Sequence, residues 1–147
     1  MKRILFGFLL CFLQACSNQD PQSPEAQVRD TLTAIEVAAE ERSLSDIMQH
    51  VSKNYRDHEG RALDDLKRTA QLYLLSNQKI HIFTRITSIE INDGLASVEV
   101  SAAMASTEAA LADENSRLRA DTHRFSLVLA LEGDDWLLTS ASWQRGW

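Results

Sequence analysis

The sequence predicts an α+β fold in which helices and strands are segregated along the chain. Apolar residues recur at helical spacing up to about residue 76, whereas β-branched and alternating apolar residues dominate from residue 80 onward. Apolar residues make up 44% and charged residues 24% of the 147 residues, which suits one folded domain and excludes a wholly disordered protein. The formal charge of −6 argues against a nucleic-acid partner, because phosphates repel a net anion.

Three helices are expected in the first half of the chain. Ser23 and Pro24 predict the start of the first, Glu25 to Glu41, because serine caps a helix and proline suits its first turn. Its apolar stripe is Val28, Leu32, Ile35 and Ala39. A second, short helix has the stripe Leu44, Ile47, Met48 and Val51, and a third has Leu63, Leu66, Ala70, Tyr73 and Leu74. Each stripe predicts one buried helix face.

Four strands are expected after the helices, at residues 80–91, 95–103, 122–131 and 136–143. Asn92-Asp93-Gly94 is a hairpin signal between the first two. Apolar and polar residues alternate along the second and third strands, which predicts an antiparallel sheet covered on one face only. The three helices are the expected cover. Residues 105–120 fit neither period and are compatible with a short helix or with a lid.

The N-terminal residues predict export. Lys2 and Arg3 precede ten uncharged residues, 4–13, which are too short to span a hydrocarbon core and therefore indicate a signal peptide. The segment Leu13-Gln14-Ala15-Cys16 resembles the lipobox of bacterial lipoproteins. This resemblance implies that residues 1–15 are removed and that Cys16 receives a diacylglycerol and an acyl chain such as palmitate. An ordinary secretory signal cut after Ala15 is the alternative.

The resemblance also implies a location. Ser17 resembles the outer-membrane sorting signal of such lipoproteins, so we expect an outer-membrane lipid anchor and a domain in the periplasm. Residues 16–24 are then the lipidated cysteine and a polar, flexible tether, and residues 25–147 are the domain. Because Cys11 leaves with the signal peptide, the mature domain has no free thiol.

The order of elements resembles the NTF2-like fold, which includes ketosteroid isomerase and the SnoaL-like cyclases. Several segments are also similar to small proteobacterial lipoproteins of that superfamily: Tyr55–Arg61, Asn77–His81, Arg119–Phe125 and Ser140–Trp143. The resemblance covers Glu25–Trp147. It implies a curved sheet rolled against its helices into a cone with an internal pocket.

Five polar side chains are candidates for that pocket: Tyr55, Asp57, His81, Arg85 and His123. Asp57 lies where the isomerases carry a base, but the two groups that assist that base have no counterpart here, so no complete catalytic set is predicted. Its alternative role is to cap a turn. His123 is expected to point inward, either to contact a ligand or as a core histidine. His81 and Arg85 line the cavity or, if their strand bulges, face solvent.

Trp136 and Trp143 have opposite parity on the last strand, so they are expected on opposite faces of the sheet unless a bulge intervenes. An exposed Trp143 is a candidate contact for a protein partner, and its alternative is to pack on the tether or the first helix. A homodimer through the open sheet face is a further hypothesis.

No metal and no cofactor is expected. The histidines at 50, 58, 81 and 123 have no ligand spacing, and the sequence has no Gly-x-Ser-x-Gly elbow or phosphate-binding glycine loop. We therefore expect a non-catalytic lipoprotein that binds a small apolar ligand or an envelope protein. The alternative is an isomerase or dehydratase that uses Asp57 or His123 as its general base.

Overall fold

The fold consists of three helices followed by four strands, in the order that the sequence predicts. The computed structural model describes residues 23–108 and 118–146. The helices are α1 (Pro24–Glu40), α2 (Leu44–Gln49) and α3 (Leu63–Ser76), and the strands are β1 (Asn77–Asn92), β2 (Leu95–Glu108), β3 (Leu118–Glu132) and β4 (Asp135–Arg145). The strands form one antiparallel sheet in the order β1-β2-β3-β4. The α+β prediction is confirmed.

The N-terminal predictions fall outside this range. The predicted signal peptide, Cys16 and the tether up to residue 22 lie outside the described residues. No helix within the described ranges is long and apolar enough to cross a membrane.

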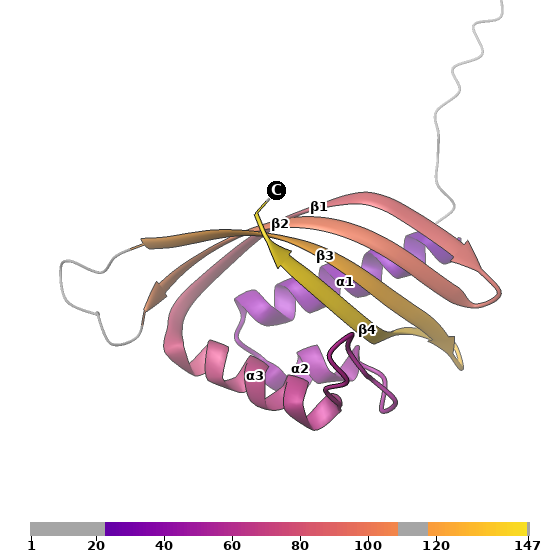
Figure 1. The fold of residues 1–147 in the computed structure, drawn as a ribbon, viewed down its shortest axis with the longest axis horizontal. Helices are drawn as coiled ribbons and strands as arrows, with labels where there is room; N and C mark the ends of the chain where they lie inside the picture. The colour runs from indigo at the N-terminus through magenta and orange to yellow at the C-terminus, as the bar shows by residue number, and fades with distance from the viewer. Residues whose placement is uncertain (1–22, 109–117, 147) are drawn as a thin grey trace, which may run out of the picture.

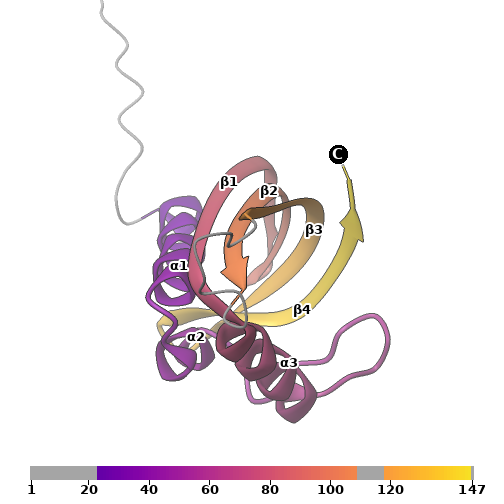
Figure 2. The same ribbon diagram turned by 90° about the vertical axis from the view of Figure 1, so that its left-hand side faces the viewer.

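The sheet is strongly curved, and all three helices lie on its inner side (Figures 1 and 2). Helix α1 starts as predicted, with the Ser23 hydroxyl accepting a hydrogen bond from the backbone N–H of Ala26 at 3.2 Å. The β1–β2 turn is also the predicted one. Asp93 and Gly94 have φ values of 47° and 75°, the left-handed pair that a tight hairpin requires.

Residues 105–120, which fit neither the helical nor the strand period, are strand at both ends of the segment. Strand β2 continues to Glu108 and β3 begins at Leu118, with Ala105 paired to Ala120. Residues 109–117 lie outside the described residues, so the alternatives of a short helix and a lid remain expectations for that stretch.

Two β-bulges decide which side chains face inward. Ile86 pairs with Val100 and Ser88 with Glu99, so Thr87 is the extra residue in β1. In β4, Ser140 pairs with Val128 and Leu138 with Leu129, which makes Thr139 the extra residue. Both threonine hydroxyls donate to a carbonyl of the neighbouring strand at 3.0 Å. Because an extra residue reverses the parity of the strand beyond it, each bulge keeps apolar residues on the inner face.

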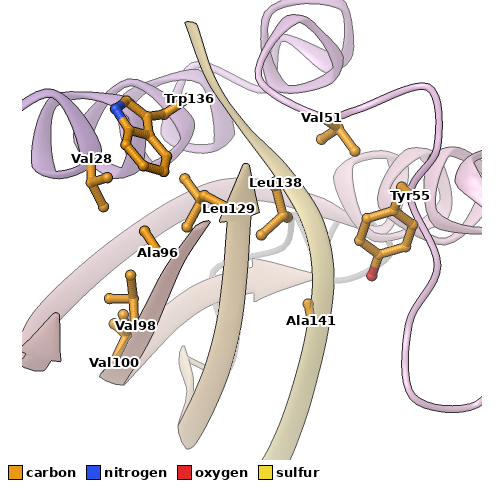
Figure 3. Packing of buried hydrophobic residues seen from close by; sticks show 10 residues of the cluster. All are labelled: Val28, Val51, Tyr55, Ala96, Val98, Val100, Leu129, Trp136, Leu138 and Ala141. Carbon is orange, nitrogen blue, oxygen red and sulfur yellow. The ribbon is translucent and has the colours of Figure 1, made fainter. Parts of the chain in front are cut away.

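The buried hydrophobic cluster extends along the space between helices and sheet, from Val28 and Trp136 to Val51 and Tyr55 (Figure 3), and it is packed most tightly at the end near Val28. Val28 of α1, Val98 of β2 and Leu129 of β3 are almost completely buried there. Trp136 closes this end, since its indole is 3% exposed and its Nε1–H donates to Gln27 Oε1 at 3.2 Å. At the other end the side chains do not meet, and a cavity remains.

Candidate functional site

The candidate site is a cavity of about 270 Å³ between the inner face of the sheet and the helices. Every strand and every helix contributes to its wall. Its lining side chains are apolar apart from those of Glu36 and Thr84. The residues that line it are Leu32, Ile35, Glu36, Ala39, Ile47, Val51, Leu66, Ile82, Thr84, Ile86, Val100, Ala102, Met104, Phe125, Leu127, Leu138, Ala141 and Trp143. This is the surface that an apolar ligand requires, because such walls offer water almost no hydrogen bonds.

The helical stripes of the sequence explain how the cavity forms. Along the predicted stripe of α1, Val28 packs in the core, whereas Leu32, Ile35 and Ala39 line the cavity. Three lining positions carry small side chains, Ala39 on α1 and Ala102 and Ala141 on the inner face of the sheet. Larger residues there would fill the space, so the alanines keep it open.

The two polar side chains of the wall contact each other. The Thr84 hydroxyl of β1 donates to Glu36 Oε2 of α1 at 2.5 Å. One turn further along α1, Glu40 Oε1 accepts from the backbone N–H of Ile82 at 2.7 Å, but Glu40 is not part of the lining. These contacts attach α1 to β1 at the edge of the sheet, and only the first pair borders the cavity.

Trp143 lies on the same inner face of the sheet as Trp136, which is the arrangement expected if a bulge intervenes. The bulge at Thr139 is the reason, because it reverses the parity of β4 between the two tryptophans. Trp143 lines the cavity and keeps 36% of its surface exposed. The guanidinium of Arg61 lies 4.8 Å from its ring centroid, and the His58 ring meets it edge-on at 6.2 Å. Among the described residues, its ring contacts are therefore with this loop, and the expected contact with the tether lies outside the described residues.

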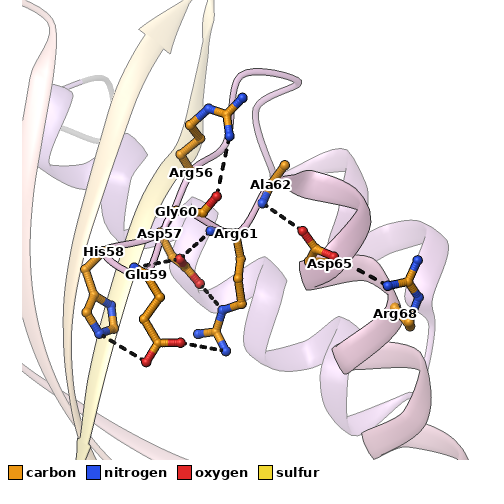
Figure 4. Close-up of polar contacts among 9 residues, drawn as sticks. All are labelled: Arg56, Asp57, His58, Glu59, Gly60, Arg61, Ala62, Asp65 and Arg68. Carbon is orange, nitrogen blue, oxygen red and sulfur yellow. Dashed lines mark hydrogen bonds and ion pairs between the residues drawn. The ribbon is translucent and has the colours of Figure 1, made fainter.

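Asp57 is held by the loop between α2 and α3 (Figure 4). Its Oδ1 accepts from the backbone N–H groups of Glu59 and Arg61, each at 2.9 Å, and its Oδ2 accepts from Arg61 Nε at 2.5 Å. Burial raises the pKa of Asp57, but the hydrogen bonds from Arg61 and Glu59 outweigh it and hold that pKa below its usual value. The side chain is 3% exposed and does not line the cavity, so the turn-capping role is the one that the geometry favours.

Tyr55 belongs to the packed core and not to the cavity wall. It is 1% exposed, and its hydroxyl has no hydrogen-bond partner among the described residues. Burial, reinforced by the nearby Asp57 carboxylate and opposed by Arg61, raises the pKa of Tyr55 to about 12. The phenol is therefore protonated at neutral pH and forms part of the hydrophobic cluster.

His81 and Arg85 point away from the cavity, which corrects their placement in its wall. On this part of β1 the inward positions are Ile82, Thr84 and Ile86, so the odd-numbered residues face out. The His81 side chain is 65% exposed, and Arg85 is exposed as well. The isoleucines decide the orientation, since only one face of the strand meets the helices.

His123 shares the inner face of β3 with the lining residue Phe125, and their ring centroids are 5.9 Å apart. Its Nδ1 is buried and has no hydrogen-bond partner among the described residues. The imidazole lies beside the wall without being part of the lining. None of the five predicted residues lines the cavity, and only Tyr55 and Asp57 lie close together. Over the part of the chain that the structure describes, no group of histidine, cysteine and acidic residues is arranged to hold a metal ion.

Comparison with known proteins identifies the architecture. No protein-family model matches the sequence, and no curated protein matches it. A candidate dehydratase of the NTF2-like family from Streptomyces avermitilis superposes with a TM-score of 0.71 at 16% identity, over 82% of this chain and 95% of that one. A candidate scytalone dehydratase from Novosphingobium aromaticivorans gives 0.73 at 8% identity, over 84% of each chain. The chain has the NTF2-like fold.

A further NTF2-like superfamily protein, from Salmonella enterica serovar Typhimurium, superposes with a TM-score of 0.68 at 11% identity, over 82% of this chain and 89% of that one. The expected NTF2-like fold is therefore confirmed, including its curved sheet. At these identities the similarity concerns the fold alone.

Within this NTF2-like fold, sequence reasoning missed the two polar residues of the cavity wall. Glu36 follows Leu32 by four residues and precedes Ala39 by three, which is the spacing of the buried stripe. Thr84 has the parity of Ile82 and Ile86. A polar residue at an apolar, periodic position was the available signal in both cases.

Proposed function

We propose that this protein is a lipid-anchored, non-catalytic binding protein whose cavity holds a small apolar ligand. The observation that carries the proposal is the almost wholly apolar lining of a 270 Å³ space to which all three helices and all four strands contribute. That volume corresponds to about nine water-sized volumes, or a molecule of roughly nine or ten non-hydrogen atoms. Transfer of such a molecule from water to this wall is favourable by about 25 cal/mol per Å² of apolar surface buried.

The state of Asp57 supports binding over catalysis. A general base needs a free lone pair within hydrogen-bond reach of its substrate. Both Asp57 oxygens already accept hydrogen bonds, one of them from the cationic Arg61, and the carboxylate does not line the cavity. The lowered pKa of Asp57 also makes it a weaker base.

His123 supports the alternative, an isomerase or dehydratase. Its Nδ1 is buried without a partner, beside the wall residue Phe125, and two proteins of similar fold are named as candidate dehydratases. The pair His123→Ala and Asp57→Asn distinguishes the two functions. If either variant folds normally but no longer converts a metabolite that the wild-type protein converts, the protein is an enzyme and the non-catalytic binding function is wrong.

The binding function is tested with 1-octanol, an apolar probe of suitable size, by titration calorimetry on the purified full chain. Ala102 is 2% exposed and lines the cavity, so Ala102→Leu should fill part of the space and abolish binding. Ala103 is the next residue and faces outward, so Ala103→Leu is the matched control and should bind as the wild type does. No binding by the wild-type protein, or equal binding by both variants, would contradict the proposal.

The anchor is the second part of the proposal. It is supported by the lipobox resemblance at Leu13-Gln14-Ala15-Cys16 and by the polar tether that follows. Expressed in a bacterial host, the protein should fractionate with the outer membrane and carry acyl chains, whereas Cys16→Ser should do neither. A wild-type protein that is cut after Ala15 but carries no lipid would be an ordinary secreted protein instead. An envelope protein is the alternative binding partner to the small apolar ligand.

A further inference from the structure

Two aromatic side chains in the wall of the cavity come from neighbouring strands. Phe125 of β3 and Trp143 of β4 are directly paired in the sheet, and both line the cavity. No other lining residue within the described ranges is aromatic. The aromatic surface of the wall is therefore confined to the place where β3 and β4 lie side by side.

The two rings pack on other neighbours and not on each other. Side chains at directly paired positions start about 5 Å apart, so the rings are within reach of one another. Instead, the Arg61 guanidinium lies over the Trp143 ring at 4.8 Å from its centroid, and the His58 ring is nearly perpendicular to it. The Phe125 ring has the His123 ring beside it at 5.9 Å. What remains free on each ring is the surface that borders the cavity.

The wall next to Trp143 has room for a planar molecule. Ala141 precedes Trp143 by two residues on the same face of β4, and both line the cavity. Residues at this spacing lie about 7 Å apart, and two aromatic rings in contact have centroids about 4.5–7 Å apart. A ring that lies over the methyl group of Ala141 is therefore within contact distance of the indole.

We propose that the cavity selects a small molecule with a single aromatic ring, which packs against Trp143 and Phe125. This inference rests on the proposed binding function and names its ligand class. Two aromatic rings attract each other beyond the contribution of the apolar area that they bury, whereas a saturated ring gains the contribution of its area alone. The volume of 270 Å³, which holds roughly nine or ten non-hydrogen atoms, suits one ring with a short side chain.

The test is titration calorimetry of the purified full chain with 2-phenylethanol, 2-cyclohexylethanol and 1-octanol. The three probes have the same number of carbon atoms and the same hydroxyl group, and only the first is aromatic. Each affinity is divided by the probe's partition coefficient between octanol and water, which corrects for the different hydrophobicity of the probes. The corrected affinity of the wild-type protein for 2-phenylethanol should exceed that for 2-cyclohexylethanol about threefold to tenfold.

The variants Trp143→Leu and Phe125→Leu should each lower this ratio of corrected affinities. The matched control is Phe83→Leu, because Phe83 is an aromatic residue on the outer face of the sheet with 69% of its surface exposed. This control should keep the ratio of the wild-type protein. Nuclear Overhauser effects between the phenyl protons of the probe and the indole protons of Trp143 test the same contact in the wild-type protein.

Equal corrected affinities of the wild-type protein for 2-phenylethanol and 2-cyclohexylethanol would overturn this inference, and so would a preference that both lining variants retain. Binding of 1-octanol in that case would leave the proposed function intact. Failure of all three probes to bind would overturn the proposed function as well. If the lining variants do not fold, the nuclear Overhauser effects decide, and contacts of the phenyl group with aliphatic side chains alone would contradict the inference.

Discussion

At the scale of single residues, Asp57 shows how a loop closes on a carboxylate. The acid accepts two backbone hydrogen bonds and one from the Arg61 side chain, across a turn in which Gly60 adopts a φ of 79°. A side chain other than glycine rarely adopts that conformation. The loop in turn places Arg61 and His58 against Trp143, so Asp57 influences the cavity wall only through its neighbours.

This arrangement predicts how stability depends on pH. The pKa of Asp57 is lower in the folded protein than its ordinary value of 3.8, so its stabilisation is complete above that pH and is lost as the pH falls through the folded-state pKa. Asp57→Asn should be less stable than the wild type at neutral pH, and the difference should shrink under acid conditions. Urea unfolding at several pH values measures it, and a difference that stays constant down to acid pH would contradict it.

For Tyr55 we predict that removing the polar group does not lower the stability of the fold, in contrast to Asp57. Its hydroxyl is buried without a partner among the described residues, and a buried, unpaired polar group costs about 1–3 kcal/mol. Tyr55→Phe should therefore leave the free energy of unfolding unchanged or raise it by about 1 kcal/mol. Chemical denaturation measures this value. A loss of more than about 1 kcal/mol would mean that the hydroxyl has a partner in solution.

Single residues were the hardest part of the site to predict. The polarity of a side chain does not reveal which face of its strand it occupies. His81 and Arg85 were therefore expected in the cavity, whereas in the structure they face solvent. For Asp57 the less specific alternative, a turn cap, was the better one. Glu36 was overlooked because a glutamate on a helix is usually on its solvated face.

At the scale of elements, the bulges connect sequence to function. Without the extra residue Thr139, β4 would alternate strictly and Trp136 and Trp143 would lie on opposite faces. With it, Trp136 closes the core while Ala141 and Trp143 line the cavity. Thr87 has the same effect in β1. The even-numbered positions face inward up to Ile86, and the odd-numbered positions do so from Ile89 onward.

The hydroxyl of Thr139 should contribute measurably to the fold. It donates to the Val128 carbonyl at 3.0 Å, and a hydrogen bond of this kind contributes about 1 kcal/mol. Thr139→Val keeps the branched shape and removes the donor, so it should lose about that amount in urea unfolding. Ser140→Ala is the control, since no hydrogen bond of the Ser140 hydroxyl is described. Equal stabilities of Thr139→Val and the wild type would refute the role of this hydroxyl.

Element type and order followed from the sequence because each depends on local periodicity. The stripe of α1 and the Asn-Asp-Gly turn are examples, and both are confirmed. The bulges could not be located in advance, because a bulge is defined by the register against a neighbouring strand, which is distant in sequence. The orientation of Trp143 therefore depended on information that the strand itself does not contain.

At the scale of the whole molecule, the space under the sheet is divided in two. One end is a packed core around Val28 and Trp136, and the other is the cavity. The two parts adjoin, because Val51, Val100, Leu138 and Ala141 belong to the core cluster and also line the cavity. This division is the physical basis of the proposed binding function.

The outer face of the sheet bears on the proposed homodimer. Phe83 is 69% exposed there and lies opposite Ala103 on the neighbouring strand. If two copies pair through this face, sedimentation equilibrium should give a dimer for the wild type and a monomer for Phe83→Glu. A monomeric wild-type protein would refute the homodimer, and a dimer that Phe83→Glu leaves unchanged would place the interface elsewhere.

The central claim is that the cavity is a binding site for a small apolar molecule. The most direct measurement is mass spectrometry of the protein purified from the cells that produce it, under native and then denaturing conditions. We predict an added mass that disappears on denaturation, persists in Ala103→Leu and is absent from Ala102→Leu, while any covalent lipid remains in every case. Identical masses for the wild-type protein under both conditions would contradict the claim and direct the search to a protein partner.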